Sequence, residues 1–187
     1  MKKYILSLIF LFSILNFNVI KAQSLNQFGI KAGVNLVDLR DKLSDNEVTH
    51  VSKTGFYLGA FMEFRRSVNF SMQPEVYYSA NKNKADENIG LLHIPVLFKY
   101  KLGNRFELYG GPESQFLLSV YGEDINKNKN YKKFILSAVA GFGFSVTDEF
   151  IIDARYNVAV SNYMDFGYHV NKKLNFMQIG LAYKFDN

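Results

Sequence analysis

The feature that most restricts the fold of this sequence is its long runs in which apolar and polar residues alternate with a period of two. In residues 68–80, for example, Val68, Phe70 and Met72 alternate with Asn69 and Ser71. Eight such runs follow one another: 27–37, 53–65, 68–80, 89–101, 105–118, 133–146, 150–161 and 173–185. This pattern predicts strands with one apolar and one polar face. At roughly 11 to 14 residues each, the runs exceed the ~5–6 residues common in soluble sheets and are long enough to cross a bilayer at a tilt.

The connections between these runs alternate strictly between short and long. The short turns are expected at 65–67, 102–104 and 147–149, and the long loops, rich in Asn, Lys and Asp, at 38–52, 81–88, 120–132 and 162–172. With eight strands, both termini and all short turns fall at one end, which is the layout of bacterial outer-membrane barrels. We therefore predict an all-β fold, an eight-stranded antiparallel up-and-down transmembrane β-barrel. Its termini and short turns would be periplasmic and its long loops extracellular.

The first residues are predicted to be an export signal. Lys2 and Lys3 precede an apolar stretch over residues 4–15, and Ala22 is a small residue at a suitable cleavage position. This is the pattern of a secretory signal peptide, since the apolar stretch is shorter than the ~20 residues of a spanning helix. We expect residues 1–22 to be the signal peptide and 23–187 the barrel domain. Lys2, Lys3 and Lys21 would then account for three of the net positive charges in a formal total of +5.

Aromatic residues favour a membrane barrel over a soluble one of the same strand number. The chain has 18 Phe and 12 Tyr but no Trp. On the apolar faces they gather at the two ends of the strands, as in the aromatic girdles of membrane barrels. The set expected near the short turns is Phe64, Tyr100, Phe106, Phe144, Phe150, Tyr183 and Phe185, and the set near the long loops is Phe56, Tyr78, Phe116 and Phe134. A lipocalin-like barrel would instead turn its apolar face inward.

The polar faces are then expected to fill the lumen. They carry Lys31, Arg65, Lys99, Lys101, Arg105, Arg155 and Lys184 together with Glu63, Glu75, Glu107, Glu113 and Asp153. An eight-stranded barrel has an interior only wide enough for its own side chains, so these charges should pair and plug it. Pro74, Pro95 and Pro112 lie within predicted strands and each lacks a backbone donor, which predicts bulges at these positions.

Few other features point to chemistry. The absence of Cys excludes disulfides and thiolate sites, and 21% charged residues without a basic stripe argue against nucleic-acid binding. Residues 124–130 resemble a calcium loop, but Lys129 and Ile135 occupy positions that need Gly and Glu. His169 lies near Ser161 and Asp165, which leaves open a lipid-A-modifying hydrolase or acyltransferase. We predict no catalytic, cofactor-binding or metal-binding residue.

Several segments resemble the PorT-like outer-membrane β-barrel family of Bacteroidota. They are residues 29–35 (GIKAGVN), 73–79 (QPEVYYS), 93–100 (HIPVLFKY), 109–113 (YGGPE) and the closing 178–185 (QIGLAYKF). The resemblance spans nearly all of the predicted barrel domain and implies an outer-membrane barrel of about eight strands. The resemblance also implies that Pro74, Pro95 and Pro112 are characteristic of the family. The family's namesake assists protein secretion across the outer membrane, but the resemblance carries over no catalytic residues.

From these observations we expect a structural, interaction or secretion-accessory role through the extracellular loops. The alternatives are a lipid-A-modifying enzyme and a narrow channel. The expected partners are outer-membrane lipids and lipopolysaccharide, the barrel-insertion machinery during assembly, and secretion-system or surface proteins, with no nucleic acid and no cofactor.

Overall fold

A computed structural model describes residues 26–42, 48–82, 88–120, 132–162, 164–165 and 171–185. Its strands are β1 (Asn26–Lys42), β2 (Val48–Arg65), β3 (Phe70–Lys82), β4 (Asn88–Leu102), β5 (Phe106–Val120), β6 (Phe134–Ser145), β7 (Phe150–Ala159), β8 (Met164–Asp165) and β9 (Asn171–Lys184). Among these residues no helix is long and apolar enough to cross a membrane.

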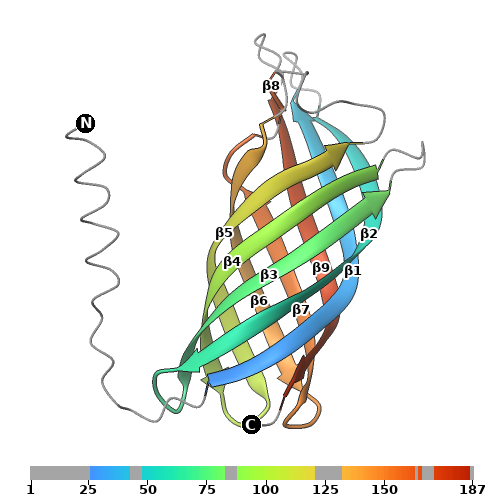
Figure 1. The fold of residues 1–187 in the computed structure, drawn as a ribbon. Helices are drawn as coiled ribbons and strands as arrows, with labels where there is room; N and C mark the ends of the chain where they lie inside the picture. Colours follow the sequence, from blue (N-terminus) through green and yellow to red (C-terminus); the bar gives the residue numbers. More distant parts are fainter. Residues whose placement is uncertain are drawn as a thin grey trace, which may run out of the picture.

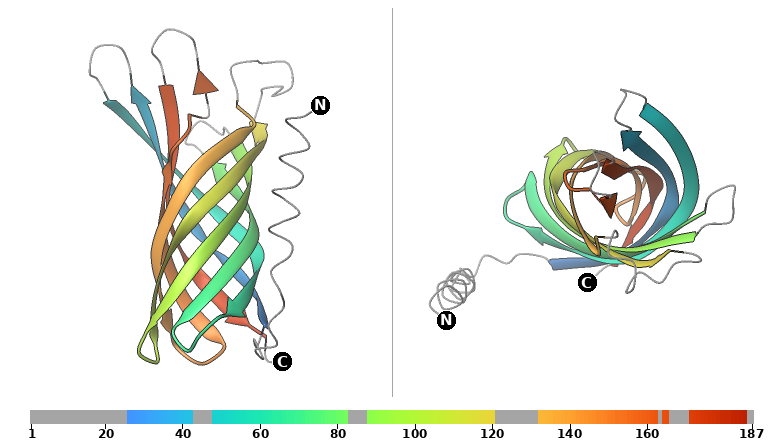
Figure 2. Two further views of the ribbon diagram at one scale, coloured as in Figure 1. Left: turned by 90° about the vertical axis from the view of Figure 1, so that its left-hand side faces the viewer. Right: turned by 90° about the horizontal axis from the view of Figure 1, so that it is seen from above.

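Eight of the strands close into a barrel. Each pairs antiparallel with its neighbour in the order β1-β2-β3-β4-β5-β6-β7-β9, and β9 pairs back with β1. The closing ladder runs from Gly29 opposite Lys184 to Lys42 opposite Asn171. Figure 1 shows the tilted strands, and the view from above in Figure 2 shows the closed ring. The predicted eight-stranded up-and-down barrel is confirmed, and the two-residue β8 pairs with β9.

The start of β1 and the end of β9 lie at the same end of the barrel as the three short connections, as predicted (Figure 1). At Gly103 in the β4–β5 turn, φ is 73°, a left-handed conformation that glycine adopts without steric cost. In the β6–β7 turn, the Thr147 hydroxyl accepts hydrogen bonds from the backbone N–H groups of Glu149 and Phe150.

The expected loop over residues 38–52 is wrong in its extent. β1 continues to Lys42 and β2 begins at Val48, with pairing unbroken between these residues. Alternation did not predict this extension, because the parts of a strand that project beyond a bilayer need no apolar face. Residues 38–42 and 48–52 are mostly polar. At the other end, Val68 was expected in a strand but lies in the β2–β3 turn and is 91% exposed.

The two faces of each strand are arranged as predicted for a membrane barrel. In β3, Glu75, Tyr77 and Ser79 are buried in the lumen, whereas Val76 and Tyr78 are exposed on the outer wall. Around the barrel the outer wall carries large apolar side chains, and the lumen carries the buried charged and amide side chains together with apolar residues such as Leu91 and Phe176. A soluble barrel would show the reverse arrangement, since its apolar face forms the core.

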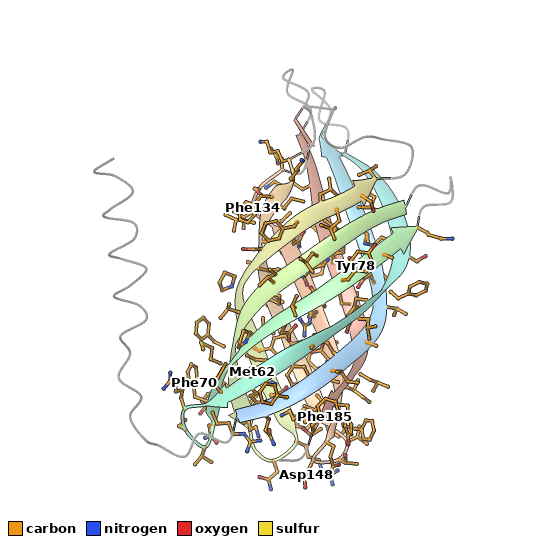
Figure 3. All side chains as sticks on the ribbon, in the orientation of Figure 1. Met62, Phe70, Tyr78, Phe134, Asp148 and Phe185 are labelled. Atoms are coloured by element: carbon orange, nitrogen blue, oxygen red, sulfur yellow. The ribbon has the colours of Figure 1, made fainter. Side chains whose placement is uncertain are left out.

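Aromatic side chains occupy both ends of the outer wall. Phe70 and Phe185 lie toward the short-turn end near Asp148, and Phe134 and Tyr78 lie toward the other end (Figure 3). Neighbouring rings pack together in each band, for example Phe106 with Phe144 and Phe116 with Phe134, whose ring centroids are 4.9 and 5.4 Å apart. The two bands match the expected girdles.

The prediction that the three prolines mark bulges is wrong. On both sides of Pro74, Pro95 and Pro112 the pairing register is the same, so no extra residue is inserted. Each proline keeps a pair with one neighbouring strand and leaves a gap in the other ladder, because it has no N–H to donate. The register shift lies instead at Gly90–Leu91 in the β4–β5 ladder.

Candidate functional site

Glu75 is the centre of an ion-pair cluster across the middle of the lumen. Its carboxylate accepts hydrogen bonds from both terminal guanidinium nitrogens of Arg155, at 2.8 and 3.2 Å, and from Lys31 Nζ at 3.0 Å. Gln73 donates a further bond at 2.7 Å. These residues lie on β3, β7 and β1, so the cluster ties together strands that are not neighbours in the sheet.

Asp153 is the second acid of this cluster. Arg155 donates to its carboxylate through Nε at 3.1 Å, and Lys31 Nζ lies 3.6 Å from it. The Tyr109 hydroxyl also donates to Asp153. The two cations lie near aromatic rings, with Lys31 Nζ 5.4 Å from the ring centroid of Tyr57 and the Arg155 guanidinium 5.2 Å from that of Tyr109. Such contacts help to compensate buried cations for lost hydration.

A second cluster of charged side chains fills the lumen toward the short-turn end. Lys99 Nζ lies 2.5 Å from Glu107 and 3.7 Å from Glu63, and Lys184 Nζ lies 2.8 Å from Glu63. All four side chains are at most 5% exposed. The expectation of a mixed-charge lumen with paired ions is confirmed for these groups.

Three of the expected lumenal charges are not fully inside. Arg105 is exposed in the β4–β5 turn, and Lys101 and Arg65 are only half-buried near the barrel mouth. These residues lie at the ends of strands, where the chain leaves the barrel wall. Alternation no longer predicts there which side chains face the lumen, so the expected lumenal position was wrong. Arg65 still reaches inward and donates to the Gln27 side-chain oxygen at 2.7 Å.

Sequence reasoning missed a buried serine–histidine–acid arrangement. Ser79 Oγ lies 2.8 Å from His93 Nε2, and His93 Nδ1 lies 2.7 Å from Glu113 Oε1. This is the hydrogen-bond order of a catalytic triad. The three residues occupy lumen-facing positions on the consecutive strands β3, β4 and β5. Only their shared inward face could have indicated this contact, because no motif in the sequence joins them.

The arrangement is sealed from solvent. Ser79, His93 and Glu113 are each 0% exposed. Glu113 also accepts hydrogen bonds from Asn157, Gln115 and the Tyr77 hydroxyl, at 2.7, 2.6 and 3.1 Å. The Ser79 hydroxyl accepts one from Asn81 at 3.2 Å. These bonds satisfy buried polar groups, and they leave no position for a substrate beside the serine.

Apolar side chains close the lumen above this polar layer, toward the long-loop end. They form one buried cluster: Val37, Ile89, Leu91, Leu117, Ile135, Leu174 and Phe176. In the charged region below, a cavity bordered by Lys31, Lys99, Glu107 and Asp153 has a volume of about 10 Å³. That is room for about one water molecule. The lumen is therefore a packed interior in three layers, one apolar, one hydrogen-bonded and one charged.

The residues singled out for enzymatic or metal chemistry are not assembled into a site in the described part of the chain. Ser161 Oγ accepts a hydrogen bond from the backbone N–H of Leu136 at 2.8 Å. His169, the side chain of Asp165 and the calcium-like stretch 124–130 lie outside the described residues. Ile135 is buried in the lumen. No cluster of three or more His, Asp or Glu side chains suited to a metal is found in the ranges given above.

The comparisons with known proteins agree with this geometry. The family described as outer membrane protein beta-barrel domain matches residues 21–165. No curated protein sequence matches the chain.

Solved structures share the fold at low sequence identity. Ail, the attachment invasion locus protein of Yersinia pestis, is 17% identical, with 86% of this chain and 99% of Ail covered and a TM-score of 0.54. The same protein in complex with the heparin analogue sucrose octasulfate gives 16% identity, the same coverage and a TM-score of 0.52. Neisserial surface protein A is 18% identical, with 84% of this chain and 97% of that protein covered and a TM-score of 0.51.

Proposed function

This chain belongs to the family of outer membrane protein beta-barrel domains, and from that premise we propose that it is a closed, non-conducting scaffold for its surface loops. Its role would be structural, interactive or accessory to secretion. In this proposal residues 1–22 are removed as a signal peptide, the termini and short turns face the periplasm, and the four long connections face the outside.

The packed lumen is the observation that carries this proposal. Cations and carboxylates cross it in bonded pairs, and an apolar layer closes it toward the long loops. Opening a water-filled path would require these buried pairs to separate, at a cost of several kcal/mol for each ion left unpaired. A narrow channel is therefore disfavoured, and the long connections are the part of the chain available for contacts.

Reconstituted protein is expected to give no ion conductance. The mature barrel, inserted in planar lipid bilayers under an applied voltage, should remain electrically silent because paired charges and an apolar layer fill the described part of the lumen. An outer-membrane porin inserted in the same way controls for the bilayer and for detection. Reproducible conductance steps that scale with the amount of folded barrel would contradict the closed-lumen proposal and favour the channel.

The proposed orientation can be tested by cysteine labelling, since the natural chain contains no Cys. Asn128→Cys, in the connection between β5 and β6, is expected to react with a membrane-impermeant maleimide in intact cells. Asp148→Cys, in the exposed turn between β6 and β7, is expected to react only after the outer membrane is permeabilised. Labelling of the turn residue alone in intact cells would show that the barrel has the opposite orientation.

We further propose that the protein is not an enzyme. The candidate whose geometry most resembles a catalytic triad is Ser79 with His93 and Glu113. It is fully buried, and the Ser79 hydroxyl already has hydrogen-bond partners in His93 and Asn81. A nucleophile needs an approach path for the reacting atom, and this serine has none. For the second candidate, His169 with Ser161 and Asp165, the one described contact of the Ser161 hydroxyl is the hydrogen bond that it accepts from the backbone N–H of Leu136.

A narrower assignment to the PorT-like family rests on the short motifs quoted above. The Gln73-Pro74-Glu75 segment contributes Glu75 to the central ion cluster, and Pro112-Glu113 contributes the acid beside His93. These motifs thus supply the lumen's key carboxylates. They support a secretion-accessory scaffold, with outer-membrane lipids, the insertion machinery and surface proteins as partners. The sulfated sugar is a ligand of Ail, and low identity gives no reason to transfer it.

A further inference from the structure

A groove on the outer wall near the long-loop end is shaped to hold a ligand. It spans β1, β2 and β3 and has a volume of about 510 Å³, within the roughly 300–1,000 Å³ of small-molecule sites. Its lining includes Val34, Leu36, Phe56, Tyr78, Ala80 and Lys82. Except for Lys82 these residues present apolar surface on the membrane-facing side of the barrel, and the lining also includes the polar residues Thr54 and Asn35.

Small residues between two large rings produce the groove. Ala80 lies opposite Phe56 on β2, so the wall is low beside that ring. Phe56 stands out from the wall and is 68% exposed. Tyr78 lies over Gly90, where an added Cβ would come within 2.6 Å of the tyrosine hydroxyl. The hollow therefore lies between the side chains of Phe56 on β2 and Tyr78 on β3, above the small Ala80.

Lys82 gives the groove a charged end at the membrane surface. Tyr78 belongs to the aromatic band of the long-loop end, and such bands lie at the bilayer interface. Lys82 is four residues further along β3, roughly 13 Å toward the loops, on the same face. Its exposed ammonium group thus lies at the level of the lipid headgroups, where it attracts anionic phosphate.

We propose that this groove is a binding site for lipid A, with an acyl chain along Phe56 and Ala80 and a phosphate of the headgroup beside Lys82. The mostly apolar hollow fits a hydrocarbon chain, and the Lys82 ammonium group at its outer end fits an anionic headgroup. The choice of lipid A rests on the proposed orientation, which puts the long-loop end in the outer leaflet.

Native mass spectrometry of the mature barrel in detergent, titrated with hexa-acylated lipid A, tests the site. Ala80→Phe fills the hollow and is expected to weaken lipid A binding about tenfold. Lys82→Gln removes the charge and is expected to weaken it about fivefold, the equivalent of about 1 kcal/mol. It adds no bulk to the wall, so it tests the site even if the phenylalanine variant fails to fold.

Two matched variants control for bulk and charge. Ala138→Phe adds the same ring on the exposed face of β6, across the barrel, and Arg66→Gln removes a cation from the exposed β2–β3 turn. Both should bind lipid A within twofold of the unsubstituted protein. Equal affinities for Ala80→Phe and Ala138→Phe would overturn the proposal, as would lipid A binding no tighter than phosphatidylethanolamine. Because the assay uses micelles, its outcome is independent of the conductance and orientation tests.

Discussion

Replacing Glu75 with leucine is expected to lower the free energy of unfolding of the barrel by about 3–5 kcal/mol, the usual cost of removing one partner from a buried ion pair. The substitution would leave Arg155 and Lys31 without their main acceptor, and these side chains are only 4% and 3% exposed. Denaturant titration of the refolded barrel in lipid vesicles, followed by heat-modifiable migration on gels, measures the change.

Two further variants separate the charge from the space that the side chain fills. Glu75→Gln keeps the shape and one acceptor oxygen, so its loss of stability should lie between that of the natural protein and that of the leucine variant. Asp148→Leu removes an exposed acid from a turn and should leave the unfolding midpoint unchanged. If Glu75→Leu unfolded at the same denaturant concentration as Asp148→Leu, the central cluster would contribute nothing to stability.

Replacing Gly33 with valine is expected to prevent the barrel from closing, with a stability loss above about 4 kcal/mol. Gly33 lies opposite Gly180 in the ladder that joins β1 to β9. A Cβ at Gly33 would clash with the carbonyl oxygen of Ile179 and would lie 2.7 Å from a ring carbon of Tyr57. At Gly180 it would clash with the Tyr57 hydroxyl.

Tyr57 explains why both positions need glycine. Its ring lies inside the barrel where side chains from Gly33 and Gly180 would otherwise project, and it packs beside Tyr77 at a centroid distance of 5.5 Å. The seam that closes the barrel is thus covered from within by an aromatic residue of β2. The expected result for Gly33→Val is the absence of the heat-modifiable folded band after refolding.

Ala32→Val is the matched control for the Gly33→Val variant. It adds branched bulk at the adjacent residue of the same strand, but Ala32 is exposed on the outer wall. Valine also has a higher strand propensity than alanine. This variant should therefore refold like the natural protein, and a barrel that tolerated Gly33→Val equally well would contradict the role assigned to the glycine pair.

The architecture could be predicted because it depends on local pattern. Alternation along each strand determined which residues face lipid, and the lengths of the connections determined which ends meet. The boundaries of β1 and β2 were misjudged because their outer parts need no apolar face. The register shift at Gly90–Leu91 was missed because it lies at the end of β5, where only Ser119 and Val120 follow the extra residue, too few to show the change of phase that it causes.

The lumenal contacts could not be predicted in detail. The alternation placed Lys31, Glu75 and Arg155 inside, but their bonds join residues 44 and 80 positions apart in the sequence. Which lumenal residues meet depends on the tilt and stagger of the strands, and these follow from the closed ring rather than from any one segment. The same reason hid the contact of His93 with Ser79 and Glu113.

The cross-lumen cluster also has a consequence for recognition at the rim. Because Glu75 on β3 is bonded to residues on β1 and β7, the wall is braced from inside and the strand ends that carry the long connections keep fixed separations. A partner arriving at that rim would meet attachment points that need no ordering of their own. Because these attachment points are already in place, a partner that contacts them would lose less conformational entropy on association, which favours tighter binding for a given contact area.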